Sequence, residues 1–382
     1  MIEPTMYSDF DRTAMQRALE LAARGLATTH PNPRVGCVIA RNGRIVGEGW
    51  HARAGEAHAE VAALAAAGSE AAGATAYVTL EPCNHQGRTP PCVDALLAAR
   101  IARVVYALPD PNPRVAGGGG ARLEAAGVRV AAGLLAAEAA ELNAGFLKRM
   151  RTGRPWVRVK LAMSLDGRTA LASGASRWVS GEAARADVQH WRARSAAILT
   201  GVGTVLADDP RLDVRLADAP AAAPRPLRVV LDSTLRTPPA ARLFTVPGEV
   251  LIITALGASD ARWEPRCAAL AAHGARIETL PAAQARVPLA AVLERLGELE
   301  INELQVEAGP TLAGELLRQG LCDELLLYVA PKLLGPAARP LLALPEPASL
   351  AAAPELRIAE VARVGDDLRL RLRPAAAAPE PR

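Results

Sequence analysis

The stretch that decides the fold of the first half is VTLEPCNHQGRTPPC, residues 78–92. It begins as an apolar strand, continues as a polar, proline-punctuated loop, and ends at Cys92, where a run of good helix formers begins. Cys83 therefore follows a strand and Cys92 opens a helix. Upstream, the motif HAE at residues 58–60 opens another helix. Histidine and cysteine at three element ends predict a metal site.

Imidazole and two thiolates form a donor set that zinc favours, and three protein ligands leave a fourth position for water, as in catalytic sites. We therefore expect His58, Cys83 and Cys92 to hold one zinc ion, which makes a water molecule nucleophilic near neutral pH. Glu60 is then no ligand but moves the proton of that water to a leaving amine. Zinc deaminases carry H-x-E followed by P-C-x-x-C. Here the cysteines are nine positions apart instead of three.

Each of these residues also has a plain structural interpretation. Taken singly, Cys83 and Cys92 fit buried thiols, and His58 fits a helix-cap histidine. His51 and His85 are rival metal ligands, although His85 lies in the loop between the cysteines and is expected to face substrate or solvent. The zinc site is preferred because all the parts occur together and in this order.

Composition limits the other functions. The 382 residues are 50% hydrophobic and 22% charged, which predicts a globular protein of two domains. A net charge of +4 and 3% aromatic residues argue against a nucleic-acid surface. Five cysteines, an early acidic interruption of the N-terminal segment and the lack of an 18-residue apolar run favour a cytoplasmic protein without a membrane partner. The small net charge is compatible with a small acidic or phosphorylated substrate.

The order of the expected elements predicts two α/β halves. In the first half, helices are expected at 11–27, 60–67, 92–99, 121–126 and 136–149, and strands at 35–40, 45–50, 74–80, 103–108 and 128–131. This order predicts a mostly parallel sheet covered by helices. In the second half, strands are expected at 156–162, 196–202, 226–232, 249–255, 303–309 and 324–330, mostly with helices between them. The expected domains are 1–151 and 152–374. An Ala/Pro-rich surface loop is expected at 217–226, and a disordered tail at 375–382.

Residues 30–51, 57–60 and 78–92 closely resemble the riboflavin-biosynthesis deaminases of the cytidine-deaminase-like superfamily. The eight-residue loop between the cysteines is the specific mark, because other deaminases share only H-x-E and P-C. The resemblance implies an α/β/α fold, the same three zinc ligands, and Glu60 as proton donor. This chain has Asn84 and Gln86 where the family usually has Ser and His. Asn32 is either a substrate contact or a turn residue between two prolines.

The second half has weaker signals of its own. No G-x-G-x-x-G follows a strand and opens a helix, and GVGT at 201–204 is a fragment typical of a turn. The segment EAGPTLAG, residues 307–314, follows a strand and opens a helix, so it suits a phosphate but also fits a tight strand–helix junction. Residues 161–168 are a second candidate edge of a cofactor site. Asp208 and Asp209 follow a strand and either enter a cleft or form a solvated turn.

Residues 160–170, 173–178, 201–212, 229–233, 306–317 and 329–335 are similar to the reductase half of the bifunctional bacterial enzymes of riboflavin synthesis, whose fold is similar to that of dihydrofolate reductase. The resemblance implies NADPH contacts at Ala162, Trp178, Thr204, Asp208, Ser233, Gly309, Pro310, Thr311, Leu312, Ala313, Gly314 and Glu315. It implies substrate contacts at Ser176, Arg192, Leu212, Arg215 and Glu307. The two arginines suit a sugar phosphate, but they also fit solvated surface residues. Close relatives often carry Gly where this chain has Ala162.

The expected function is therefore two steps of riboflavin synthesis. Zinc hydroxide deaminates 2,5-diamino-6-ribosylamino-4(3H)-pyrimidinone 5′-phosphate, and NADPH then reduces the ribosyl group to ribityl, giving 5-amino-6-ribitylamino-uracil 5′-phosphate. Asp208 is the expected acid of the second step, with Lys160 as an electrostatic helper, and a homodimer is favoured. The alternatives are another zinc-dependent nucleobase or nucleic-acid deaminase with a nucleotide-binding second domain, and a structural zinc module. Few aromatic residues oppose editing of nucleic acid, and only three ligands oppose a structural zinc.

Overall fold

The structure is a computed structural model that describes residues 7–86, 90–112, 118–216, 225–280 and 286–375. The chain divides into two compact units, Met1–Gly153 and Arg154–Arg382, a division two residues beyond the boundary expected from the sequence. Residues 376–382 of the expected tail and 217–224 of the expected loop lie outside the described residues. No described helix is long and apolar enough to cross a membrane.

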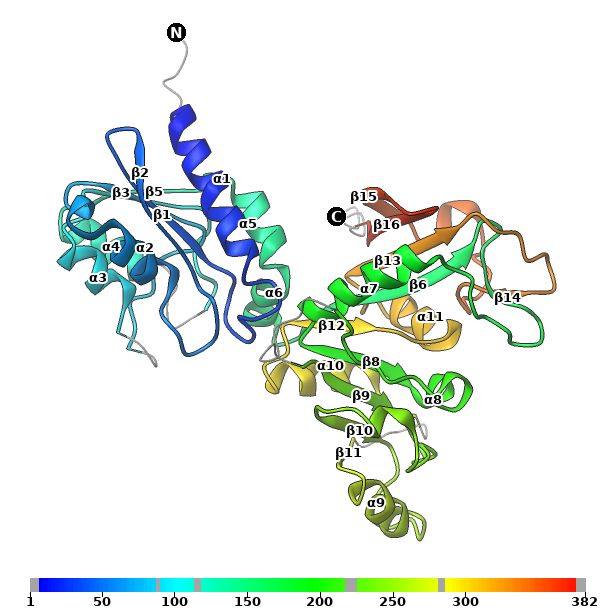
Figure 1. Ribbon diagram of the computed structural model, residues 1–382. Coiled ribbons are helices and arrows are strands. Elements are labelled where there is room, and N and C mark those ends of the chain that lie inside the picture. The colour runs from blue at the N-terminus through cyan, green and yellow to red at the C-terminus, as the bar shows by residue number, and fades with distance from the viewer. Residues whose placement is uncertain (1–6, 87–89, 113–117, 217–224, 281–285, 376–382) are drawn as a thin grey trace. The chain divides into compact units, whose positions relative to one another are not determined.

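The first unit is built on a five-stranded sheet in the order β2-β1-β3-β4-β5 (Figure 1). Its strands are β1 (Gly36–Arg41), β2 (Arg44–Trp50), β3 (Thr75–Val78), β4 (Arg103–Tyr106) and β5 (Arg129–Ala132). Its helices are α1 (Asp9–Ala23), α2 (Ala59–Ala67), α3 (Cys92–Ala98), α4 (Gly118–Ala125), α5 (Ala136–Leu142) and α6 (Ala144–Thr152), with the short 3-10 helix η1 (Gly68–Ala71) after α2.

Helices cover both faces of this sheet, which makes an α/β/α sandwich. Successive side chains of a strand point to opposite faces, and β1 shows this directly. Cys37 and Ile39 pack with α2, α3 and α4, whereas Val38 and Ala40 pack with α1 and α5. The predicted α/β/α architecture of the first half is therefore confirmed.

The prediction of a mostly parallel sheet was wrong for β1. Strands β3, β4 and β5 are parallel, but β1 is antiparallel to both β2 and β3. The hairpin at Asn42-Gly43 reverses the chain, and α2 then carries it over β1, so that β3 pairs with β1 on the side away from β2. Strands β2 and β3 do run in the same direction, as a crossover through a helix requires, but β1 separates them.

Two helix boundaries also differ from the expectation. The helix expected at 121–126 begins three residues earlier, since α4 starts at Gly118 and includes a run of glycines. The helix expected at 136–149 is two helices, α5 and α6, which meet at Asn143. The Asn143 side chain accepts a hydrogen bond from the Arg34 backbone N at 2.8 Å and donates one to the Arg34 carbonyl at 2.8 Å. This buried clamp ties the junction of the two helices to the segment before β1, while the Asn143 backbone N still donates to the Ala139 carbonyl at 3.2 Å.

The second unit is built on a nine-stranded sheet in the order β11-β10-β9-β8-β12-β6-β13-β16-β15. Its strands are β6 (Trp156–Ser164), β8 (Ala197–Gly201), β9 (Leu227–Leu231), β10 (Val250–Thr254), β11 (Ala275–Thr279), β12 (Glu303–Val306), β13 (Glu324–Ala330), β15 (Leu356–Val364) and β16 (Asp367–Pro374). A separate pair is formed by β7 (Arg168–Ala170) and β14 (Arg339–Pro340). Its helices are α7 (Glu182–Arg194), α8 (Val202–Asp208), α9 (Trp263–Ala271), α10 (Leu289–Glu298) and α11 (Pro310–Arg318), with the 3-10 helices η2 (Arg242–Phe244) and η3 (Leu350–Ala352).

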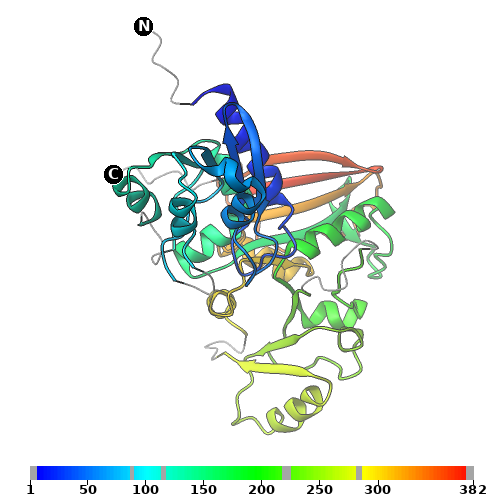
Figure 2. The same cartoon turned by 60° about the vertical axis from the view of Figure 1, so that its left-hand side comes forward.

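Strands β6 and β8 to β13 are parallel, and the C-terminal hairpin β15–β16 adds an antiparallel edge beside β13 (Figure 2). One core lies under α10 and α11, and the other face packs against α7, α8 and α9. The hairpin was not predicted, although Leu368, Leu370 and Leu372 alternate with arginines in the period of a strand. Parallel strands place their carboxyl ends at one edge of the sheet, where ligands bind in open α/β folds.

Two candidate active sites

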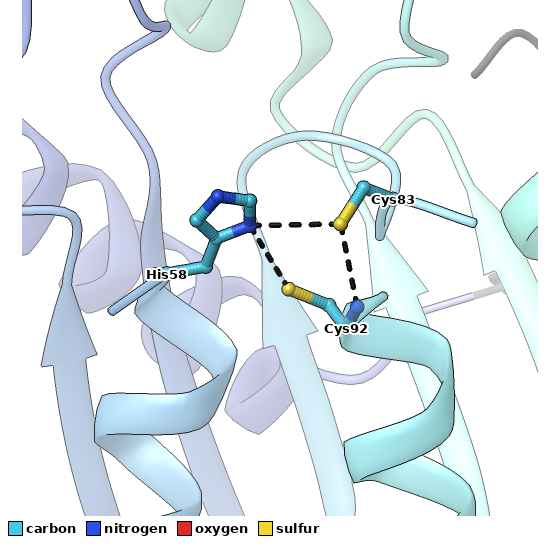
Figure 3. A group of neighbouring side chains, drawn as sticks. All are labelled: His58, Cys83 and Cys92. Atoms are coloured by element: carbon cyan, nitrogen blue, oxygen red, sulfur yellow. Dashed lines mark hydrogen bonds between the residues drawn. The ribbon is translucent and has the colours of Figure 1, made fainter. Parts of the chain in front are cut away.

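The structure brings the three predicted metal ligands together in the first unit (Figure 3). His58 is the residue before α2, Cys83 lies in the loop after β3, and Cys92 is the first residue of α3. The Nδ1 atom of His58 lies 3.1 Å from the Cys92 Sγ and 3.5 Å from the Cys83 Sγ. The backbone N of Cys92 also donates to the Cys83 Sγ at 3.3 Å. One imidazole nitrogen and two sulfur atoms thus surround a single position, where they could bind one metal ion.

The donor set fits a zinc ion. Without a bound metal ion, the Cys83 and Cys92 sulfurs share one proton, which Cys92 keeps. A hydrogen bond from Cys92 holds the pKa of the Cys83 thiol at about 4 in spite of burial, whereas the same contact and burial raise the pKa of Cys92. A zinc ion replaces that shared proton and keeps both sulfurs as thiolates. Among the described residues, this is the one group of three such side chains that can hold a metal.

Glu60 lies beside this group without belonging to it. It is the second residue of α2 and is only 3% exposed. Burial, and next the charge of the Cys83 thiolate, raise the pKa of Glu60 to about 7. The carboxyl group reaches the Cys92 thiol by a hydrogen bond. The side chain can therefore exchange a proton with a group bound at the metal.

Close packing of α2 against β2 sets the direction of the His58 and Glu60 side chains. A Cβ atom on Gly49 of β2 would lie 2.4 Å from the backbone N of Ala63 and 2.5 Å from the carbonyl of Ala59. Only glycine permits this approach. The first turn of α2 is thereby fixed over the sheet, with its N-terminal end at the metal site.

A second contact fixes the cysteine loop. Glu81 is 3% exposed, and its Oε1 accepts hydrogen bonds from the backbone N atoms of Gly119 at 3.0 Å and Gly120 at 3.1 Å. A Cβ on Gly119 would lie 1.9 Å from the Pro82 carbonyl oxygen. The N-terminal end of α4 therefore supports the residue before Cys83. Sequence reasoning missed this role of Glu81. The run of glycines at the start of α4 was the available signal, because it allows the backbone to approach Glu81 and Pro82 closely.

The rival ligand His51 has other partners. Its Nδ1 lies 3.1 Å from the carbonyl of Ala57, and its Nε2 lies 3.0 Å from the Nδ2 of Asn32. These contacts assign the ring proton to Nδ1, because a carbonyl only accepts, and burial lowers the pKa of His51. The ring stands 5.3 Å from that of His58. Asn32 and neutral His51 thus form a polar wall beside the metal ligands, while His85 is outside the metal-binding group.

The second site is a cavity of about 1430 Å³ at the carboxyl ends of the parallel strands. It is lined by the end of β6, the start of α8, the segment after β9 and the N-terminal end of α11, together with residues of α7. The expected cofactor residues that line it are Ala162, Trp178, Thr204, Asp208, Ser233, Gly309, Pro310, Thr311, Leu312 and Glu315. The expected substrate residues that line it are Ser176, Arg192, Leu212, Arg215 and Glu307.

Two expected cofactor residues are placed differently. Ala313 is fully buried in the core under the sheet, and Gly314 is packed against the backbone of Ala343, where an added Cβ would lie 2.7 Å from a carbonyl oxygen. Neither residue lines the cavity. The helix itself is the reason, since residues that follow the exposed first turn of α11 rotate toward the core.

Arg192, Glu307 and Lys160 form the charged floor of the cavity. Arg192 Nε donates to Glu307 Oε1 at 2.6 Å, and Arg192 Nη2 donates to Glu307 Oε2 at 2.8 Å. Burial opposes the charged form of Glu307, but Arg192 and then Lys160 lower the pKa of this carboxyl to about 2. Burial lowers the pKa of Lys160, and Arg192 adds to that effect while Glu307 opposes it. Glu307 is therefore ionised near neutral pH.

Arg215 and Asp208 are more exposed to solvent than Arg192 and Glu307. The Arg215 side chain is 50% exposed and donates to Asp213 at 2.5 Å, and its backbone N donates to the Gln189 side chain at 3.0 Å. Asp208 ends α8, and its carbonyl accepts a hydrogen bond from Arg177.

The sequence reasoning missed several cavity residues of α7, among them Arg185 and Gln189. Arg185 lies 4.5 Å from the Trp178 ring centroid, and Gln189 holds the Arg215 backbone. The signal was available, because both lie on the helix that carries Arg192.

Both units match known families. Residues 8–108 match the cytidine and deoxycytidylate deaminase zinc-binding region, and residues 155–370 match the RibD C-terminal domain. The riboflavin biosynthesis protein RibD of Escherichia coli is 52% identical over 371 residues, which cover 95% of this chain and 99% of that protein. RibD of Haemophilus influenzae is 47% identical over 377 residues, covering 96% and 98%.

Solved structures agree with these matches along the whole chain. One form of Acinetobacter baumannii RibD has a TM-score of 0.88 at 46% identity and covers 96% of this chain and 99% of its own. A Thermotoga maritima structure described as a diaminohydroxyphosphoribosylaminopyrimidine deaminase and 5-amino-6-(5-phosphoribosylamino)uracil reductase has a TM-score of 0.83 at 31% identity, with the same coverage. With a deaminase zinc-binding region and a reductase domain in one chain, this protein belongs to the RibD family of bifunctional riboflavin biosynthesis enzymes.

Proposed function

We propose that the two units act in succession on one phosphorylated pyrimidine. Family membership makes the chain a riboflavin-biosynthesis enzyme with a deamination step and a reduction step, and it does not favour the alternative of a nucleic-acid deaminase. The proposed substrate is 2,5-diamino-6-ribosylamino-4(3H)-pyrimidinone 5′-phosphate. The proposed product is 5-amino-6-ribitylamino-uracil 5′-phosphate. The single observation that carries the proposal is the presence of a complete His-Cys-Cys group with Glu60 in one unit and an arginine-lined cavity in the other.

The first step is assigned to the metal site. His58, Cys83 and Cys92 would hold the zinc ion, and a bound zinc would supply a nucleophile near neutral pH by lowering the pKa of water. Glu60 would take a proton from the attacking water as its oxygen bonds to C2, and deliver the proton to the 2-amino group, so that the C2–N bond breaks and ammonia leaves. Asn32 and His51 face the pyrimidine ring with an amide and a neutral imidazole, which can donate and accept hydrogen bonds. The second product of this step is the 2-oxo pyrimidine.

The second step is assigned to the cavity. NADPH, when bound, would supply a hydride for C1′ of the open-chain imine form of the ribosylamine, whose C=N bond becomes a single bond. At the N-terminal end of α11, the backbone N–H groups of Gly309, Thr311 and Leu312 and the positive end of the helix dipole are the proposed partners of the cofactor diphosphate. Arg215 binds the substrate phosphate, and the ion pair of Arg192 with Glu307 presents a fixed carboxylate to the ribose hydroxyls. Asp208, at the rim, is the proposed donor of the proton that the imine nitrogen takes up, and Lys160 is the proposed electrostatic helper.

The test is a paired assay on the purified, zinc-loaded protein. The diaminopyrimidinone ribosyl phosphate is supplied first without and then with NADPH, and ammonia release and NADPH oxidation are followed together. We expect ammonia in both cases and oxidation only after deamination. Ammonia without oxidation removes the reductase assignment, and neither signal from zinc-containing protein removes the proposed substrate. The expected homodimer and cytoplasmic location stay predictions, the second of which suits thiolate ligands that need reducing surroundings.

A further inference from the structure

A buried glutamine, Gln305, contacts the carboxylate on the floor of the reductase cavity. Gln305 belongs to β12, which lies between β8 and β6 in the sheet (Figure 1), and it is fully buried. Its Nε2 donates a hydrogen bond to Glu307 Oε1 at 2.7 Å. Glu307 lines the cavity, whereas Gln305 does not. Gln305 can therefore act on a bound ligand only through Glu307.

The hydrogen bond from Gln305 changes how many more donors the Glu307 carboxylate can accept. Oε1 accepts from Arg192 Nε at 2.6 Å and from Gln305 Nε2 at 2.7 Å, whereas Oε2 accepts from Arg192 Nη2 at 2.8 Å. Each oxygen of a carboxylate has about two acceptor positions. Donors from the described residues therefore fill Oε1 and leave one position on Oε2. Without Gln305, each oxygen would have one open position.

The backbone of Glu307 is fixed by the neighbouring strand β8. Its N donates to the Leu199 carbonyl at 2.9 Å, and its carbonyl accepts from Thr200 Oγ1 at 2.6 Å. The place of the carboxylate is then decided by its two side-chain partners. Arg192 reaches it from α7 through a long side chain, whereas Gln305 reaches it from the strand that precedes Glu307. Gln305 is thus the partner that ties the carboxylate to the sheet.

The amide of Gln305 is costly at this position. Its Oε1 is buried and accepts no hydrogen bond from any described residue. A buried carbonyl oxygen without a partner lowers stability, because it has lost its hydrogen bonds to water. An apolar side chain of similar size would avoid that cost and fill the core equally well. The presence of an amide is therefore explained by the bond that its Nε2 makes to Glu307.

We propose that Gln305 is a positioning residue of the reductase site, which closes Glu307 Oε1 to ligands and leaves Oε2 to accept one hydroxyl group of the bound ribosyl phosphate. The inference rests on the proposed reductase function, in which Glu307 contacts the ribose, and adds the residue that decides which oxygen does so. A hydroxyl that donates to one fixed oxygen holds the sugar in one orientation. With both oxygens open, part of the bound substrate would present C1′ wrongly to the hydride donor, and misplacement of reacting atoms slows a reaction.

The first test compares the full zinc-loaded chain with its Gln305→Met variant, which keeps the approximate volume of the side chain and removes the donor. In reduction of the deaminated substrate we expect kcat to fall about 10- to 100-fold, while the KM values for this substrate and for NADPH stay within about threefold. The urea midpoint of the second unit should stay the same or rise, because the unpartnered Oε1 is removed as well. Gln16→Met, at an exposed position of α1, is the control for the substitution itself.

A merely structural role of Gln305 would give a different result. A lower urea midpoint with a rise in both KM values, or an unchanged kcat, would overturn the proposal. A double-mutant cycle with Glu307→Gln adds a second criterion. If Gln305 acts through Glu307, the double variant should match Glu307→Gln within about twofold in kcat. Additive losses would mean that Gln305 acts independently and would also overturn the proposal.

A crystal structure of the wild-type protein with the deaminated ribosyl phosphate supplies a readout that does not depend on turnover. We expect one ribose hydroxyl within hydrogen-bond distance of Glu307 Oε2 and none on Oε1. In crystals of Gln305→Met, a hydroxyl should be found on Oε1 as well. A hydroxyl on Oε1 of the wild-type protein would overturn the proposal. If the wild-type complex shows the expected contact but the protein oxidises no NADPH, the role of Gln305 stands and the reductase function fails.

Discussion

Arg192 holds Glu307 by two parallel hydrogen bonds, of 2.6 Å and 2.8 Å, although the two residues are 115 positions apart in the chain. The first belongs to α7 and the second follows β12, so the pair ties a helix on one face to the carboxyl end of a central strand. Both side chains are mostly buried, with 9% and 15% exposed. The pair orients two groups of the cavity and keeps the carboxylate charged.

Replacing Glu307 by Gln should impair reduction alone. Gln keeps the shape but removes the charge, and it leaves Arg192 with a weaker, neutral partner. Loss of one charge-assisted hydrogen bond costs about 1.5–3 kcal/mol, so kcat/KM for reduction should fall about 10- to 100-fold. Ammonia release should stay at the wild-type rate. Glu264→Gln, at an exposed position of α9, is the control for the loss of a carboxylate. An equal loss of both activities would point to misfolding.

Replacing Glu60 by Gln should abolish deamination and preserve the metal. The buried Glu60 carboxyl is the proposed proton carrier and is not one of the three grouped ligands. General acid–base catalysis contributes about 10²- to 10⁴-fold, so ammonia release should fall by at least about 100-fold. Zinc content, measured by atomic absorption, should remain one per chain, and reduction of pre-deaminated substrate should be unchanged. Glu56→Gln is the control, since Glu56 is exposed and nearby. Loss of zinc from Glu60→Gln would make Glu60 a ligand instead.

Two adjacent glycines of α4 should respond oppositely to alanine. A Cβ on Gly119 would lie 1.9 Å from the Pro82 carbonyl oxygen, whereas a Cβ on Gly118 would meet the Asn84 side chain at ordinary distances of 3.5 and 3.8 Å. Gly119→Ala must therefore displace the residue before Cys83, and we expect it to lower zinc occupancy and ammonia release at least tenfold, a loss of about 1.4 kcal/mol.

Gly118→Ala should keep both properties and gain up to about 1 kcal/mol of stability, because alanine favours a helix over glycine. Equal behaviour of the two variants would mean that contact between α4 and the cysteine loop does not position Cys83. Reduction, measured on the same preparations, should be unaffected in either case.

The sequence predicts the local parts of this molecule better than its long-range pairings. His58, Cys83 and Cys92 were found because each lies at the end of an element that the sequence pattern shows. The position of β1 between β2 and β3 depends on which edge a returning strand joins, and no local pattern records that choice. Likewise, nothing in the neighbourhood of Arg192 or Glu307 shows that they pair, so Arg192 was expected to be free for phosphate.

Two other differences between the sequence-based predictions and the structure have an identifiable physical cause. The break at Asn143 comes from a side chain that bonds the Arg34 backbone, 109 residues away, and overrides local helix propensity. Ala313 and Gly314 were assigned to the cofactor because the matched motif includes them. The helical period places them on the core side of α11.

A buried ion cluster on the sheet predicts how acid affects the second unit. Glu324 of β13 is fully buried and accepts hydrogen bonds from Arg158 Nε and Arg371 Nη2, each at 2.6 Å, and Arg158 also donates to Glu303 at 3.1 Å. Burial disfavours the charge on Glu324, but Arg158 first and then Arg371 lower the pKa of this carboxyl from 4.5 to about 2. The stabilisation from Glu324 is therefore complete above pH 4.5 and is lost as the pH falls toward 2.

Glu324→Gln should lower the unfolding free energy of the second unit at pH 7 by about 3 kcal/mol, because it leaves buried arginines with less negative charge around them. It should also flatten the decline of stability between pH 4.5 and pH 2, since the titrating carboxyl is gone. Urea unfolding followed by tryptophan fluorescence measures both effects, because four of the five tryptophans lie in this unit, namely Trp156, Trp178, Trp191 and Trp263. Glu264→Gln, at an exposed site, should reproduce the wild-type curve at every pH. If Glu324→Gln keeps the wild-type acid slope, the decline belongs to other carboxyl groups and the ion cluster does not set the acid stability of this unit.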